Sequence, residues 1–110
     1  MEIPQIPQDE FIEPTESRTL RVSGSDISRI TKALKSPTRQ KILSILRDTP
    51  LDVSRIAERL KQTEANVSAQ VQLLQKAGLV NCRYEAGDHG VRKICEVVVD
   101  KIIITLEWIA

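Results

Sequence analysis

Apolar residues recur at the spacing of amphipathic helices in four successive stretches of the chain. Each stretch follows a residue type that commonly caps a helix N-terminus, namely Ser25, Ser36, Asp52 and Thr63. Gly78 is a typical helix stop and ends the fourth stretch. The expected buried stripes are, in order, Ile27, Ile30 and Leu34; Ile42, Leu43, Ile45 and Leu46; Val53, Ile56, Ala57 and Leu60; and Val67, Val71, Leu73 and Leu74.

The third and fourth predicted helices are separated only by Lys61, Gln62 and Thr63. Two helices joined by so short a turn, with apolar stripes that must meet, form a helix-turn-helix unit. The outward face of the second helix is unusual, because it lacks the Lys and Glu of an ordinary solvated face. It consists of Ala65, Asn66, Ser68, Ala69, Gln72 and Gln75.

After the fourth helix the apolar period changes from 3.6 to 2, and a turn from Gly87 to Gly90 separates two strands. With Asp88 and His89 at the tip, Val80, Cys82 and Tyr84 lie opposite Val97, Cys95 and Lys93, and Glu85 lies opposite Arg92. The first face is mostly apolar and the second mostly charged, as in a half-buried antiparallel hairpin. Helices followed by a hairpin predict an α+β, mostly α fold: a winged helix-turn-helix of three to four helices plus a β-hairpin wing, with flanking strand or helix segments.

The chain divides into four regions by composition and periodicity. Residues 1–17 read as an acidic flexible tail, either a solvated leader or an arm that competes with a polyanion for a basic face. Residues 18–35 contain a short strand with Leu20 and Val22 and then the first helix; residues 36–99 hold the winged helix-turn-helix. Residues 100–110 are apolar, and their periodicity fits a strand or a helix.

The near-neutral formal charge hides an uneven distribution. Residues 1–17 hold five acidic and no basic side chains, whereas the remaining residues hold 16 basic and 10 acidic ones, a net charge of +6. This permits an anionic partner. No apolar run reaches the roughly 18 to 20 residues that span a bilayer, so we expect a cytoplasmic protein without a membrane partner. The single His has no nucleophile or paired carboxylate at catalytic spacing, so we expect no enzyme and no cofactor.

Four segments resemble the ArsR-type transcriptional regulators, particularly the archaeal ArsR-like proteins: "SPTRQKIL", "LDVSRIAERL", "NVSAQVQLLQKAGLV" and "GDHGVRKICEV". The resemblance covers residues from about Lys35 to Val99. It implies that the helix at 63–77 enters the DNA major groove and that the hairpin, 82–95, is a wing on the backbone or minor groove. Metal-sensing relatives carry Cys or His/Asp clusters that this chain lacks, so we expect no metal site.

Short hydrogen-bonding groups and methyl groups suit the base edges of the major groove. The expected base contacts are Gln62, Ala65, Asn66, Ser68, Ala69 and Gln72, and the expected backbone contacts are Thr38, Arg39, Lys61, Thr63, Arg83, His89, Arg92 and Lys93. Alternatives remain for several of these: Arg39 can brace the fold, Glu85 can pair with Arg92, and His89 can simply be solvated. Gln70 is expected at the edge of the core.

A single reading helix makes few base contacts, so we expect a homodimer on double-stranded DNA. The expected interface, for which intrachain packing is the alternative, is Leu20, Val22, Ile27, Ile30, Leu34, Ile102, Ile104, Leu106, Trp108 and Ile109. Cys82 and Cys95 are either two small buried apolar residues or a redox pair. The alternatives to a sequence-specific regulator are an architectural DNA-binding protein and a protein–protein module of the transcription machinery. The effector is unknown.

Overall fold

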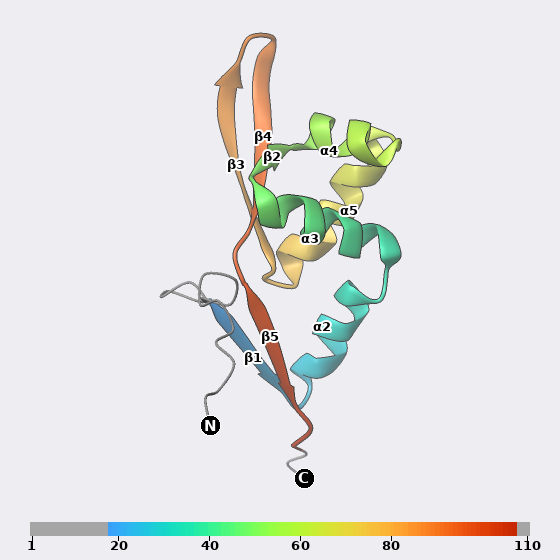
Figure 1. Ribbon diagram of the computed structural model, residues 1–110, viewed down its shortest axis with the longest axis vertical. Helices are drawn as coiled ribbons and strands as arrows, with labels where there is room; N and C mark the ends of the chain where they lie inside the picture. The colour runs from blue at the N-terminus through green and yellow to red at the C-terminus, as the bar shows by residue number, and fades with distance from the viewer. Residues whose placement is uncertain (1–17, 108–110) are drawn as a thin grey trace, which may run out of the picture.

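The computed structural model describes residues 18–107, so the acidic tail and the expected interface residues Trp108 and Ile109 lie outside the described part. The elements follow one another as shown in Figure 1. They are β1 (Thr19–Ser23), α2 (Asp26–Leu34), α3 (Pro37–Asp48), β2 (Leu51–Asp52), α4 (Val53–Leu60), α5 (Glu64–Lys76), β3 (Val80–Gly87), β4 (Gly90–Val97) and β5 (Lys101–Thr105). This is a winged helix-turn-helix, in which β3 and β4 form the wing.

Three of the four predicted helix caps are confirmed. The backbone N–H groups three residues further on donate to Ser36 Oγ at 3.3 Å, Asp52 Oδ1 at 2.8 Å and Thr63 Oγ1 at 3.1 Å. Each bond satisfies a donor that the first helical turn leaves without an intrahelical partner. Ser25 occupies the cap position of α2, but its side chain makes no capping bond; Ile27 N donates to the Gly24 carbonyl instead.

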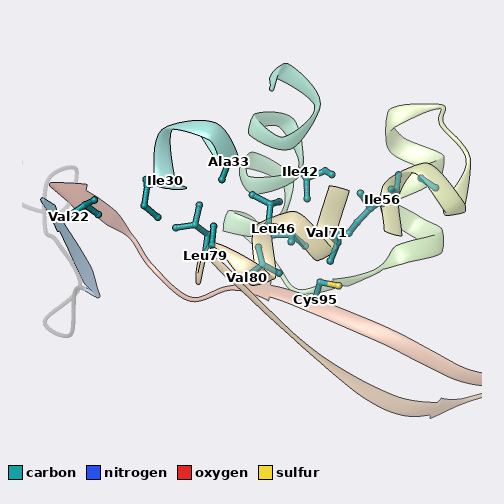
Figure 2. Close-up of a cluster of buried hydrophobic side chains, with 14 residues drawn as sticks. Val22, Ile30, Ala33, Ile42, Leu46, Ile56, Val71, Leu79, Val80 and Cys95 are labelled. Atoms are coloured by element: carbon teal, nitrogen blue, oxygen red, sulfur yellow. The ribbon is translucent and has the colours of Figure 1, made fainter. Parts of the chain in front are cut away.

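The core joins all the helices around α5 (Figure 2). Val67, Val71 and Leu74 are each 0 % exposed, so α5 buries one complete face. The prediction for Leu73 is wrong, because this side chain is 44 % exposed. Successive residues point in directions about 100° apart around the helix axis, so Leu73 and Leu74 face different sides of α5. Only the side that carries Leu74 faces the core.

The hairpin register is confirmed along the whole wing, including Cys82 opposite Cys95 and Glu85 opposite Arg92. The two-residue strand β2 adds to the other edge of β4, with Leu51 opposite Cys95. A strand of two residues has no detectable period, so the sequence could not reveal it. It attaches the wing directly to the start of α4.

The expected division of the wing into an apolar and a charged face is only partly correct. At the inner end Val80 and Cys95 are buried in the core, but Tyr84 on the same face is 71 % exposed. Ile94 on the charged face is buried. The hairpin extends beyond the helices (Figure 1), so only its inner half is covered by the rest of the protein.

Within the C-terminal apolar segment, Lys101–Thr105 form a strand and not a helix. β5 pairs in parallel with β1, and this two-stranded sheet lies at the opposite end of the molecule from the wing tip (Figure 1). Arg18 and Asp100 join the two strands at their start. The backbone N–H of Arg18 donates to Asp100 Oδ2 at 2.8 Å, and Arg18 Nη2 forms an ion pair with Asp100 Oδ1 at 3.2 Å. These bonds from Arg18 lower the pKa of the Asp100 carboxyl.

The neighbouring leucines of α5 give a direct test of this packing. Leu74→Ala should lower the free energy of unfolding by about 2–5 kcal/mol, because it leaves a cavity in a fully buried site. Leu73→Ala, the matched control, should cost less than about 1 kcal/mol, since its side chain is 44 % exposed. Urea denaturation followed by circular dichroism measures both; equal losses would contradict the orientation of α5.

Candidate nucleic-acid interface

The exposed face of α5 presents most of the residues expected to contact bases. Ala65, Asn66, Ala69 and Gln72 are exposed, while Gln62 and Ser68 are half-buried. The turn before this helix is fixed by Lys61, whose φ of 56° is left-handed, and by a bond of 3.0 Å from Gln62 N to the Ala57 carbonyl. This turn sets the direction in which α5 leaves α4, and therefore where its polar face points.

A cleft of about 850 Å³ lies between the start of α4, the start of α5 and the outer half of the wing. Ala65 and Ser68 line it from α5, and His89, Arg92 and Lys93 line it from the wing. Residues 21 to 28 positions apart in the sequence, expected to contact bases and the DNA backbone, therefore share one concave surface.

Arg55 and Glu64 are among the residues of this cleft that the sequence did not indicate as site residues. Arg55 is exposed in the first turn of α4, and Glu64 is the first residue of α5. Glu64 Oε1 accepts a bond of 2.7 Å from Ser54 Oγ, which connects the N-terminal ends of the two helices. The signal for Glu64 was its position directly after the cap Thr63, where the helix dipole favours a carboxylate.

Arg92 connects the wing to the helices. Its Nη1 lies 3.4 Å from Asp52 Oδ2, and its Nη2 lies 4.0 Å from Glu85 Oε1, the predicted cross-strand partner. Asp52 is 7 % exposed and also caps α4, so a single buried carboxylate holds both elements. Because two carboxylates share the Arg92 guanidinium, it is a weaker candidate for a phosphate contact than the sequence suggested.

Arg83 is also paired within the wing. Its Nε lies 2.7 Å from Glu85 Oε2 and its Nη1 lies 3.8 Å from Glu96 Oε1. The hydrogen bond to Glu85 raises the pKa of the Arg83 guanidinium. A phosphate would have to compete with these carboxylates for Arg83.

The guanidinium of Arg39 braces the fold, which is the alternative that the sequence left open for it. It donates to the carbonyls of Ala33 and Lys32, both at 2.8 Å, and to Gln70 Oε1 at 2.7 Å. The first two bonds satisfy carbonyls at the C-terminal end of α2, where a cation is also favoured by the helix dipole. The third bond holds Gln70 at the edge of the core, as expected, and so attaches α5 to α2 and α3.

Hydrogen bonds continue from Gln70 along the polar face of α5. Gln70 Nε2 donates to Asn66 Oδ1 at 3.5 Å, and Asn66 Nδ2 donates to Gln62 Oε1. Asn66 and Gln70 are four positions apart and so are neighbours on one face of α5, and Gln62 lies in the turn just before this helix. Two candidate base contacts, Gln62 and Asn66, are therefore positioned by a chain of bonds that begins at Arg39.

The remaining backbone candidates are more loosely held. Lys61 and His89 are exposed, the latter at the wing tip, while Thr38 and Lys93 are half-buried. Thr63 is exposed, and its hydroxyl oxygen accepts the capping bond from Asn66 N.

The expected dimer interface is divided by the structure. Val22 at 2 % exposure and Ile30 at 0 % belong to the core of the chain itself, so the prediction that they form an interface is wrong. Strand β1 and helix α2 pack on the same core as α5, which uses those two side chains. Ile104 and Leu106 are 37 % and 88 % exposed. The other four described residues of the expected interface are partly buried and pack against the core; they are Leu20, Ile27, Leu34 and Ile102.

The two cysteines are in contact across the wing. Their Sγ atoms lie 2.7 Å apart, and both thiols are free. Burial, followed by the bond with Cys82, raises the pKa of the Cys95 thiol to about 12. Cys95 is fully buried, whereas Cys82 is half-buried.

Within residues 18–107 there is no group of three or more His, Cys, Asp or Glu side chains arranged to hold a metal ion. In the same range, none of the helices is both long and apolar enough to cross a bilayer.

Comparison with known proteins agrees with the fold. The sequence pattern described as "Bacterial regulatory protein, arsR family" matches residues 36–81. The HTH-type transcriptional regulator NmtR of Mycobacterium tuberculosis is 33 % identical over 72 residues, which are 66 % of this chain and 56 % of NmtR. The chain thus spans little more than half the length of this curated relative.

Solved structures show the same architecture. HlyU from Vibrio cholerae superposes with a TM-score of 0.59 and 27 % identity over 66 % of this chain and 75 % of its own. A homodimeric winged helix-turn-helix DNA-binding domain from Mycobacterium bovis gives a TM-score of 0.59 at 23 % identity, over 88 % of this chain and 75 % of that one. These relatives are bacterial, and they give no support to the archaeal affinity expected from the sequence. Residues 36–81 are thus similar to the ArsR-family regulatory proteins, and the chain has a winged-helix fold.

Proposed function

We propose that this protein is a sequence-specific transcriptional regulator that binds double-stranded DNA as a homodimer, with residues 63–77 in the major groove and the wing, residues 82–95, on the backbone or minor groove. The observation that carries the proposal is the shared cleft, where Ala65 and Ser68 of α5 and the outer wing with His89 and Lys93 line one concave surface. The match of residues 36–81 to a family of regulatory proteins supports the same function.

The side chains on the exposed face of α5 suit base recognition. Asn66 and Gln72 can each pair with both the N6 and the N7 of adenine, and the methyl of Ala65 or Ala69 can contact a thymine methyl. Between Ala65 and Gln72 none of the exposed residues on this face is charged, so this part of the helix can approach base edges before its side chains meet phosphates. Among the predicted phosphate contacts, Lys61 and Lys93 have no ion pair with any described residue and are the strongest candidates.

The exposed end of the β1–β5 sheet supports a dimer. A two-stranded parallel sheet is rarely stable in water without a cover on its faces. Here Ile104 and Leu106 remain exposed although both belong to a strongly apolar segment. A second copy of the chain packed on these side chains would bury them, and binding to successive major grooves requires the two α5 helices of such a dimer to lie about 34 Å apart, one turn of DNA.

Selection of bound duplexes from a random pool tests the proposal directly. An enriched motif with two-fold symmetry and half-sites about one helical turn apart would support a dimeric, sequence-specific regulator. Retention that depends on salt without any enriched motif would indicate architectural binding instead. Absence of retention at low salt would indicate that the polar face of α5 contacts a protein.

Base and backbone contacts should respond differently to substitution. Gln72→Ala should cost about 1–3 kcal/mol on the selected sequence and relax the preference at one base pair in each half-site. Lys93→Gln should weaken binding to all sequences and lower the salt dependence by about one charge. Arg47→Gln is the matched control, because Arg47 lies near Asp100, away from the cleft. Fluorescence anisotropy at several salt concentrations measures all three; identical losses on every sequence would contradict base recognition.

The dimer has its own test. Ile104→Asp combined with Leu106→Asp should convert the protein to a monomer in sedimentation experiments, because it places charges on the exposed apolar end of β5. Val91→Asp is the control, since Val91 is 73 % exposed on the wing and should leave the oligomeric state unchanged. A monomeric wild-type protein at micromolar concentration would refute the proposed interface.

The contact between Cys82 and Cys95 supports oxidation as a further control of the wing. The raised pKa keeps Cys95 protonated near neutral pH, so the half-buried Cys82 would attack a low-molecular-weight disulfide and release one thiol. Cys95 would then lose its proton, displace the second thiol and close the cross-strand bond. Oxidised glutathione should therefore change DNA affinity in the wild type but not in Cys82→Ser. Equal affinity with and without reductant would remove this control.

A further inference from the structure

A second cleft, of about 480 Å³, lies between α2 and the C-terminal half of α5. It has no lining residue in common with the cleft beside the wing, and it lies at the other end of α5. Figure 1 places α2 at the end of the molecule opposite the wing tip. The two clefts are therefore separate, and Leu73, Lys76 and Ala77, which line the second one, belong to the C-terminal part of the segment proposed to enter the major groove.

The walls of this α2–α5 cleft are cationic and partly apolar. Among the described residues that line it there is no Asp or Glu, and the basic ones are Arg29, Lys32, Arg39 and Lys76. Ser25 and Ser28 add hydroxyl groups. Leu73, which is 44 % exposed, forms an apolar wall with Ala33 and Ala77. Cations on one side and an exposed leucine on the other are complementary to an anion that carries an apolar group.

The cations of the cleft are only partly neutralised by the protein. Arg29 lies 3.7 Å from Asp26 and donates to the Ala77 carbonyl at 2.8 Å. Lys32 and Lys76 have no ion pair with residues 18–107. Arg39 uses three of its five N–H donors in bonds to the chain, which leaves two for a ligand. Like charges in one concave site repel one another, so a bound anion would be stabilised by all four.

We propose that the α2–α5 cleft binds a small organic carboxylate with a short apolar group, and that this ligand regulates DNA binding. The carboxylate would lie among Lys32, Lys76 and the free donors of Arg39, and the apolar group would contact Leu73. The proposal of a binding site depends only on the residues that line the cleft, whereas the proposal of regulation rests on the proposed function.

The connection to the DNA-binding face is the chain of hydrogen bonds that starts at Arg39. Arg39 lines the cleft and holds Gln70 at 2.7 Å, and Gln70 in turn bonds Asn66, a candidate base contact. A carboxylate that attracts the Arg39 guanidinium toward the cleft weakens its bond to Gln70. Asn66 then loses part of its positioning, so the ligand should lower DNA affinity.

Binding is tested first on the full chain without DNA. Hexanoate is the probe, and hexanamide and sulfate are controls that lack the charge and the apolar group, respectively, all at constant ionic strength. In ¹⁵N-resolved NMR titrations, hexanoate should shift amides of α2 and the C-terminal half of α5 and bind at least about fivefold more tightly than either control. Absence of saturable shifts, or equal binding of hexanamide or of sulfate, would overturn the proposed site.

The double variant Lys32→Gln, Lys76→Gln tests the cations. Both side chains are exposed, so the fold should tolerate their loss, and hexanoate binding should weaken by about tenfold. If instead this variant keeps its hexanoate affinity, or loses DNA affinity and salt dependence in the absence of ligand, the cleft is not a carboxylate site of the proposed kind.

Regulation is tested separately with Gln70→Met, which keeps the side-chain length and removes the bond to Arg39. This variant should bind hexanoate as the wild type does, but its DNA affinity should no longer fall by several-fold when hexanoate is added. An unchanged response to hexanoate would overturn the proposed connection. If the wild type binds hexanoate at the cleft but binds no DNA, the proposed function fails and the ligand site stands.

Discussion

The structure depends on helix α5 burying one face completely while leaving the opposite face free. Val67, Val71 and Leu74 are removed from water at the centre of the core, and α2, α3, α4 and both wing strands pack around them. Burial of three branched side chains fixes the rotation of the helix about its axis, because any other rotation would expose them. The orientation of Ala65, Asn66 and Gln72 toward solvent follows from this, and so does the exposure of Leu73.

Features that depend on neighbouring residues in the chain could be predicted from the sequence. Three caps and the entire wing register came from local spacing, since a cap needs only the next three residues and a register needs only the turn. The outward face of α5 followed from the helical period in the same way. These are also the features that define the candidate DNA interface, so most of its residues could be predicted to be on the surface from the sequence.

Features that depend on contacts between distant elements could not be predicted. The sequence could not show that Arg39 is used by the C-terminal end of α2, or that Val22 and Ile30 are used by the core of the chain and not by an interface. Asp52 was identified as a cap, but its second role as a partner for Arg92 required the pairing of β2 with β4. Local sequence patterns do not show such tertiary partners. Arg39 and Ala33 are 6 positions apart in the sequence, and Asp52 and Arg92 are 40 positions apart.

Several arginines of this protein fix the positions of elements relative to one another. Arg39 joins α2 to α5, Arg92 joins the wing to α4, and Arg18 joins β5 to β1. Arginine suits this work because its planar group can donate in several directions at once. The lysines are different: Lys61 and Lys93 near the wing cleft, and Lys32 and Lys76 in the α2–α5 cleft, have no ion pair within residues 18–107. Lysines without an ion pair thus lie in both clefts, and the bonds from Arg39 through Gln70 to Asn66 run along α5 between them.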